Sequence, residues 1–147
     1  MANEVTGEGT GEISGEHLEK LRTVLSSVPF AKLLGIELAA AERGAVKLRL
    51  QVRADLRQNQ GVLHGGVIAS LIDTATAFAI VSQLTEPEKF TTVDLTVNYL
   101  RPLKEGSVTA AARVIRAGRR LLTVTAEVFD EAGNLVAVAL STYIRLV

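Results

Sequence analysis

Residues 58–80 read QNQGVLHGGVIASLIDTATAFAI, and this stretch constrains the arrangement of the whole chain. A polar loop ends in His64-Gly65-Gly66, and the following segment is apolar on nearly every helical face except at Asp73. A helix that is hydrophobic all round lies inside a protein, where a carboxylate must be paired, hydrogen-bonded or hydrated. The two glycines leave backbone N–H groups open to an incoming oxygen atom. Donors at one end and an acid on the body are what acyl chemistry needs, so this segment is a candidate active site.

The composition is that of one soluble globular domain. Of the 147 residues, 48% are hydrophobic and 22% charged, and 16 basic side chains balance 16 acidic ones. The zero net charge argues against a nucleic-acid-binding or membrane-surface protein, and the absence of cysteine removes disulfides and thiolate chemistry. No secretory signal pattern opens the chain, and the apolar run at 67–81 is interrupted by Asp73 and too short for a membrane span. We expect a cytoplasmic protein with no metal and no resident cofactor.

Hydrophobic periodicity predicts the helices and strands. Residues 1–13, rich in Gly, Glu and Thr, are predicted to be a disordered tail that precedes a single domain over 14–147. A helix is expected from Ser14 to Pro29, then one apolar turn that stops at Gly35, and a long buried helix from Gly65 to about residue 84. Period-two alternation and turn residues predict strands at 36–41, 46–53, 90–100, 107–117, 119–129 and 135–146. Most are joined by hairpins, so we predict an α+β fold whose antiparallel sheet curls around the long helix.

The loop and the helix start also resemble a known family. The pattern Q-x-x-G-x-x-H-G-G over residues 58–66, with Asp73 eight residues after Gly65, is similar to the motif of hotdog-fold acyl-CoA thioesterases. The nearest groups are the phenylacetate-pathway (PaaI-like) and human mitochondrial-type small thioesterases, with the 4-hydroxybenzoyl-CoA thioesterases as cousins. The resemblance continues through VDLTVNYLRP at 93–102 and covers residues 30–146. It implies a hotdog fold and hydrolysis of an aryl-acyl or medium-chain acyl-CoA to free acid and coenzyme A.

The resemblance implies a role for each residue of the motif. Asp73 is expected either to attack the thioester carbonyl or to activate water against it, and both roles need an ionised carboxylate. The Gly65 N–H is expected to polarise the thioester carbonyl as negative charge develops on its oxygen. Thr92 matches a Ser or Thr that positions water in the Asp-type relatives. His64 is expected to order the loop or to contact the thioester.

Further residues are expected near the substrate. Gln58 matches an Asn or Gln that hydrogen-bonds the thioester or the water, and a one-residue slip in the loop would give that role to Asn59. Gly66 is grouped with them as substrate-binding. Ala77, where the Glu-type cousins have threonine, together with an aspartate at position 73, favours the Asp-type subgroup. Basic residues near strand ends are expected to bind the phosphates of coenzyme A: Arg101, Lys104, Arg116, Arg119 and Arg120.

The spacing along the helix makes assembly part of the functional hypothesis. Gly65 and Asp73 on one helix lie about 12 Å apart, too far to act together on one carbonyl carbon. The resemblance implies a homodimer whose sites each join Gly65 of one subunit to Asp73 of the other, with two dimers forming a tetramer. Two other functions stay open at this point: a hydratase or dehydratase acting on hydroxyacyl thioesters, and a non-enzymatic acyl-CoA-binding protein.

Overall fold

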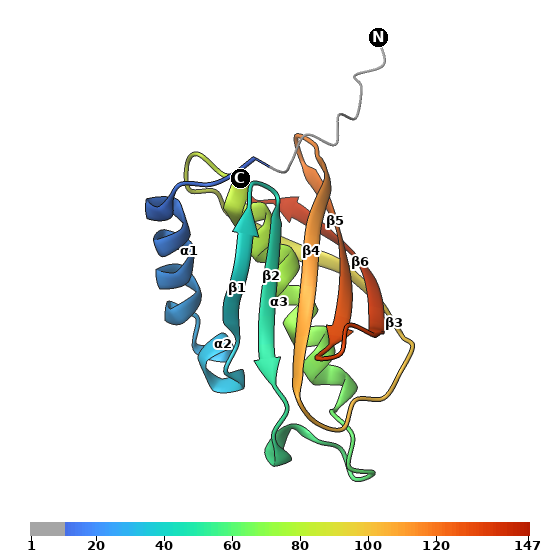
Figure 1. The fold of residues 1–147 in the computed structure, drawn as a ribbon. Helices are drawn as coiled ribbons and strands as arrows, with labels where there is room; N and C mark the ends of the chain where they lie inside the picture. Colours follow the sequence, from blue (N-terminus) through green and yellow to red (C-terminus); the bar gives the residue numbers. More distant parts are fainter. Residues whose placement is uncertain (1–10) are drawn as a thin grey trace.

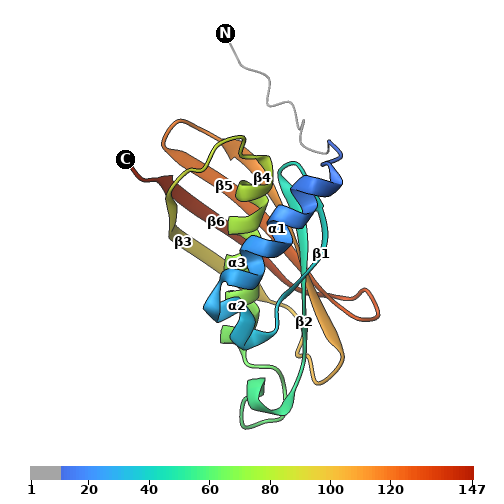
Figure 2. The ribbon, with the colours of Figure 1, turned by 90° about the vertical axis from the view of Figure 1, so that its left-hand side faces the viewer.

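The computed structural model describes residues 11–147 and shows an antiparallel sheet wrapped around one long helix (Figures 1 and 2). This is the predicted hotdog fold, and each strand lies within two residues of its expected range. The elements are, in order, α1 (Gly15–Ser27), α2 (Pro29–Leu34), β1 (Glu37–Glu42), β2 (Ala45–Gln51), a short 3-10 turn (Ala54–Leu56), α3 (Gly65–Gln83), β3 (Phe90–Tyr99), β4 (Ser107–Ala117), β5 (Leu121–Asp130) and β6 (Leu135–Arg145).

The predicted tail lies largely outside the described residues, and the part that is described contacts the domain. The Gly11 carbonyl accepts a hydrogen bond from the Arg43 N–H at 3.1 Å, and Ile13 packs against the core. Residues 11–13 therefore belong with the domain, contrary to the predicted boundary. Ser14 caps α1 as predicted, because its hydroxyl oxygen accepts from the His17 N–H at 3.1 Å.

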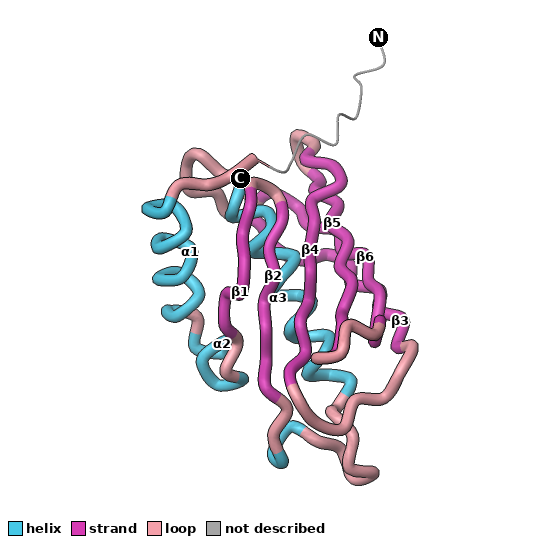
Figure 3. The backbone as a smooth tube through the Cα atoms, viewed as in Figure 1, coloured by secondary structure: helices cyan, strands magenta, loops and turns pink. Residues whose placement is uncertain are grey.

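The sheet order separates neighbours in sequence and puts β3 at an edge. The six strands run β1-β2-β4-β5-β6-β3, so β3 pairs with β6 and not with β4, which follows it in the chain (Figure 3). Alternation along β2 turns Val46, Leu48 and Leu50 toward α3, where all three are buried. The opposite edge strand, β1, is flanked by α1, whose Leu21 and Leu25 are buried in the same core.

The long helix α3 forms the centre of the core. By length and composition α3 could cross a membrane. The shorter apolar run at 67–81, which Asp73 interrupts, predicts a segment too short for that. In the fold it packs against the sheet, and Leu71, Ile72 and Ile80 have no exposed surface. Because the sheet covers its most apolar face, we assign α3 to the protein interior.

A buried hydroxyl ties the C-terminal end of α3 to the β1–β2 turn. Ser82 Oγ accepts a hydrogen bond from the Gly44 N–H at 2.9 Å and donates to the Ala79 carbonyl at 2.7 Å. Gly44 has φ of 75°, a left-handed backbone conformation that favours glycine, whereas a Cβ there would meet only the movable end of the Gln83 side chain, at 2.9 Å.

We predict that Ser82→Ala lowers the free energy of unfolding by about 1–2 kcal/mol, because the Gly44 N–H loses its partner in a buried setting. Urea denaturation followed by circular dichroism measures the change. Ser26→Ala is the matched control: that hydroxyl is exposed and bonds only to Thr23 of its own helix, so a change within about 0.5 kcal/mol is expected. Equal losses in the two variants would contradict the prediction.

Candidate active site

The start of α3 presents one free backbone donor. His64 is the N-cap residue, and its ring Nδ1 accepts a hydrogen bond from the Gly66 N–H at 2.8 Å. Within residues 11–147, no acceptor takes the Gly65 N–H, as expected for the first residue of a helix. The predicted pair of open glycine donors is thus corrected to one. The free Gly65 N–H lies at the positive end of the helix dipole, where it favours an oxygen that is gaining negative charge.

The capping bond defines the chemistry of His64. A ring nitrogen that accepts a hydrogen bond carries no proton, so the proton of the neutral ring is on Nε2. A Cβ on Gly66 would lie 3.0 Å from Nδ1, and the missing side chain therefore lets the ring approach. His64 orders the helix start, which is one of its two expected roles, and its Nδ1 is not available as a base.

The Gly65 backbone is closed on one side by Tyr99, which the sequence analysis did not single out. The Tyr99 hydroxyl donates to the Gly65 carbonyl at 2.8 Å, and a Cβ on Gly65 would lie 3.3 Å from the ring Cζ. Tyr99 ends the edge strand β3 and is half exposed. Glycine at position 65 thus leaves room for this ring.

Asp73 lies two turns further along α3 and is held by hydroxyls from two strands. Thr92 Oγ1 on β3 donates to Asp73 Oδ1 at 2.9 Å. The Tyr143 hydroxyl on β6 lies 3.2 Å from the same Oδ1 and 2.8 Å from the Asp73 backbone carbonyl. In the described part of the chain, Oδ2 takes part in no hydrogen bond or ion pair. One carboxylate oxygen is therefore anchored, and the other can take a proton or attack a carbonyl carbon.

Tyr143 is the neighbour of Asp73 that sequence reasoning missed, although its place at an inward position of the last strand was a usable signal. It is 1% exposed, its ring meets Phe90 edge-on at 5.6 Å, and its oxygen lies 2.7 Å from Thr76 Oγ1. Burial raises the pKa of Tyr143 to about 12. The hydrogen bond with Thr76 acts to lower this pKa, and the negative charge of Asp73 acts to raise it. The hydroxyl thus keeps its proton near neutral pH and stays a donor to Asp73.

Strand register brings these two hydroxyls together. Thr92 and Tyr143 are directly paired across β3 and β6, and an irregularity between Thr92 and Asp94 resets the alternation of β3. Val93 and Asp94 are consecutively exposed as a result, while Thr92 before them and Leu95 after them are partly buried. Bulges of this kind are common beside active sites, where they redirect a side chain.

The predicted loop residues are engaged within their own turn. Gln58 accepts through its side-chain oxygen from the Gln60 N–H, and its backbone carbonyl accepts from the Gly61 N–H at 3.0 Å. Asn59 is exposed in the same turn. Within the described residues, no hydrogen bond joins Gln58 or Asn59 to the groups around Asp73. Their role at the substrate stays a prediction.

The predicted basic residues form two groups in one subunit. Arg101 and Lys104 follow β3, beside a segment tied to the α3 end by the Leu63 N–H to Leu103 carbonyl bond of 2.7 Å. Arg119 and Arg120 are in the β4–β5 hairpin, and Arg116 is just before it. Most of β4 lies between the groups, and its eleven residues span about 35 Å. The two groups of one subunit therefore cannot contact the same phosphate, and the role of these residues at coenzyme A stays a prediction.

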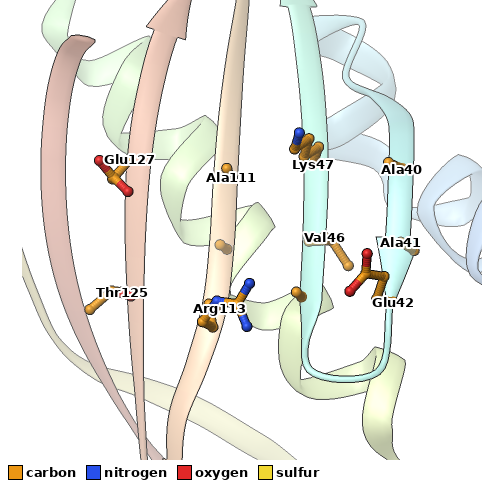
Figure 4. A pocket seen from close by; sticks show the side chains of 11 residues that line it. Ala40, Ala41, Glu42, Val46, Lys47, Ala111, Arg113, Thr125 and Glu127 are labelled. Atoms are coloured by element: carbon orange, nitrogen blue, oxygen red, sulfur yellow. The ribbon is translucent and has the colours of Figure 1, made fainter. Parts of the chain in front are cut away.

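A hollow on the outer face of the sheet is a separate feature (Figure 4). Lys47, Arg113 and Glu127 surround a floor of alanines that come from β1, β2 and β4. Lys47 alternates with Val46 and Leu48, which face α3, so the hollow lies across the sheet from Asp73. In residues 11–147, no group of three or more His, Cys, Asp or Glu side chains could hold a metal ion.

The comparison with known proteins identifies the family. Residues 60–137 match the family model of the thioesterase superfamily. The chain belongs to the thioesterase superfamily. The Escherichia coli medium/long-chain acyl-CoA thioesterase YigI is 34% identical, over 79% of this chain and 84% of that protein.

Solved structures of the thioesterase superfamily have the same fold. The PaaI protein of the E. coli phenylacetic acid degradation operon gives a TM-score of 0.83 at 25% identity, covering 92% of this chain and 97% of that one. Thioesterase HI1161 of Haemophilus influenzae gives 0.82 at 29% identity over 94% of both chains. These findings confirm the predicted PaaI-like hotdog family and the predicted enzyme class: the protein is a thioester hydrolase.

The raised pKa of Tyr143 predicts a loss of stability at alkaline pH. The hydroxyl ionises near its ordinary value of 10.0 in the unfolded chain and at about 12 in the fold. Between these values the unfolded chain loses a proton that the native state keeps, so rising pH favours unfolding. The contribution of the protonated Tyr143 hydroxyl to the free energy of unfolding is complete below pH 10, and about 2–3 kcal/mol of it is lost as the pH approaches 12.

Tyr143→Phe provides the comparison, since phenylalanine does not ionise. Urea unfolding from about pH 8 to about pH 11 should show a steeper fall in stability for the wild type than for the variant. Parallel curves would rule out the buried, protonated hydroxyl as the cause.

Proposed function

We propose that this protein is an acyl-CoA thioesterase in which the Gly65 N–H and Asp73 act on one thioester. The observation that carries the proposal is a free N–H at the positive end of a helix together with a carboxylate that has one anchored and one free oxygen. The N–H binds the thioester oxygen and stabilises the negative charge that develops there. These are the two functions that hydrolysis of a thioester needs from the protein.

The reaction balances with water as the only co-substrate. Asp73 Oδ2 takes a proton from water, whose oxygen attacks the carbonyl carbon. The carbon–sulfur bond breaks, and the sulfur of coenzyme A receives that proton while the free acid forms. Direct attack by Oδ2, giving an anhydride that water then hydrolyses, uses the same geometry. Thr92 donates its hydroxyl proton to Asp73 Oδ1, so the Thr92 oxygen is free to accept a hydrogen bond from the attacking water. This supports the expected role of Thr92.

Three features support a dimer with shared sites. Gly65 and Asp73 lie about 12 Å apart along α3, so one subunit cannot bring both to one carbonyl. β3 is an edge strand of the described sheet, and its Val93 and Tyr99 are half exposed. Beside it, the α3 face that carries Asp73 and Ala77 is only partly buried. A second copy with its β3 antiparallel to this one would continue the sheet, cover this face and pair Gly65 of one subunit with Asp73 of the other.

We extend the proposal to a tetramer of two such dimers and to an aryl-acyl or medium-chain acyl group. The E. coli relative YigI is named for medium- and long-chain acyl-CoA, and the PaaI protein comes from a phenylacetic acid operon. Leu63 and Phe78, which are apolar side chains near the start and middle of α3, are 4% and 5% exposed and belong to the core of the subunit. The acyl group is therefore expected at the subunit interface, lined by both copies.

The role of the Gly65 N–H is tested by Gly65→Pro. Proline suits the first helical position, and ψ of 132° at His64 is compatible with a following proline, so the change removes the donor without breaking the helix. Gly65→Ala is the matched control because it keeps the N–H and adds a Cβ. We predict that kcat for phenylacetyl-CoA or a medium-chain acyl-CoA falls about 10²–10³-fold further in Gly65→Pro than in Gly65→Ala. Equal activities would exclude the N–H as the oxyanion donor.

Shared sites are tested by mixing two inactive variants. Asp73→Asn cannot take the proton, and alone it should lose about 10²–10⁴-fold in kcat while folding normally. When it is co-refolded with Gly65→Pro, each mixed dimer contains one site with both groups intact. Random pairing should then restore about a quarter of the wild-type activity. If the mixture stays as inactive as its components, the sites lie within single subunits.

A further inference from the structure

We propose that Tyr143 is a positioning residue for the hydrolysis, because it fixes the direction of the Asp73 carboxylate so that Oδ2 is the reacting oxygen. The inference rests on the proposed function of Asp73. Tyr143 bonds two groups of the same residue, Oδ1 at 3.2 Å and the backbone carbonyl at 2.8 Å. A donor shared between the side chain and the main chain of Asp73 restricts rotation of the carboxylate about its own backbone.

The Tyr143 ring is a rigid reference point for this contact. It lies on β6, an interior strand, between Leu122 on β5 and Thr92 on β3. Its ring is 1% exposed and packs edge-on against Phe90. Since no surface is left for a substrate to touch, Tyr143 acts through Asp73 and does not contact the reacting atoms.

Asp73 depends on neutral donors alone. In residues 11–147, no charged side chain other than Asp73 itself forms a hydrogen bond or ion pair with Asp73, Thr92, Thr76 or Tyr143. The two donors differ in where they come from. Thr92 belongs to the edge strand that the proposed dimer covers, whereas Tyr143 belongs to the interior of the subunit. Tyr143 therefore holds the carboxylate before the second subunit is added.

Removing the hydroxyl leaves no buried polar group without a partner. Asp73 Oδ1 keeps its bond from Thr92, and Thr76 Oγ1 keeps the Ile72 carbonyl at 2.9 Å. The Asp73 carbonyl lies within the α3 helical ladder. Tyr143→Phe is thus expected to fold and to report on orientation of the carboxylate.

The test compares steady-state kinetics of the full-length wild type and Tyr143→Phe on phenylacetyl-CoA and a medium-chain acyl-CoA. We expect kcat to fall about tenfold with KM within about twofold, because a hydrogen bond to the charged reacting group is lost while substrate contacts stay. The acid limb of the pH–rate profile should move up by about one pH unit, since the carboxylate loses a donor that favours its ionised form. An unchanged kcat and profile would overturn the inference.

Two further variants separate the possible failures. Ser82→Ala removes an equally buried hydroxyl from α3 that bonds Gly44 and not Asp73, so it should lower stability and leave the pH–rate profile in place. If it moves the profile as Tyr143→Phe does, the effect is structural and the positioning role is wrong. Asp73→Asn is the reference for the chemistry. If Asp73→Asn keeps wild-type activity, the proposed function itself fails; if it is inactive while Tyr143→Phe is normal, only the positioning role fails.

Discussion

The structure depends on satisfying one carboxylate on a helix that is otherwise apolar. Asp73 could have been neutralised by an arginine or a lysine, but a cationic partner would also have attracted both oxygens and weakened their capacity to accept a proton. The fold instead supplies hydroxyl donors from β3 and β6. Neutral donors satisfy one oxygen without cancelling the charge, and the other oxygen stays reactive. The pairing of β3 with β6 is thus a chemical requirement as much as a topological one.

The two adjacent glycines at the start of α3 have different roles. Gly66 gives its N–H to the His64 ring and stabilises the helix end, whereas Gly65 keeps its N–H free and makes room for Tyr99. Each position has a close neighbour, which would have to shift to admit a Cβ. The same short segment therefore builds a helix cap and leaves one backbone donor free beside it.

The sequence predicted most of the fold because its signals are local. Alternation gave the strands, Ser14 and Gly35 marked helix ends, and the apolar stretch from Gly65 gave the central helix. Strand order could not be predicted, since pairing of β3 with β6 joins residues that lie from 38 (Tyr99 and Ala137) to 55 (Phe90 and Arg145) positions apart in the chain. For the same reason, Tyr143 beside Asp73 was not foreseen.

The candidate site was predicted as a set of residues, whose roles stay predictions, and not as a set of contacts. Family resemblance gave Asp73, Gly65 and Thr92, but the bond that removes the Gly66 donor depends on the rotamer of His64. The irregularity after Thr92 shifts the phase of β3 by one residue, and simple alternation cannot contain that information. The basic residues near strand ends lie in two groups because most of β4 separates them in space.

The exposed edge of β3 has a consequence for the behaviour of the isolated chain. Ten residues of strand offer backbone donors and acceptors along one side, and half-exposed Val93 adds apolar surface there. Such an edge is a template for uncontrolled pairing with other strands. In the proposed dimer this edge is covered, so a chain released from that dimer would be prone to precipitate and would lose solubility and catalysis together. Selection against aggregation and selection for turnover would act on the same ten residues.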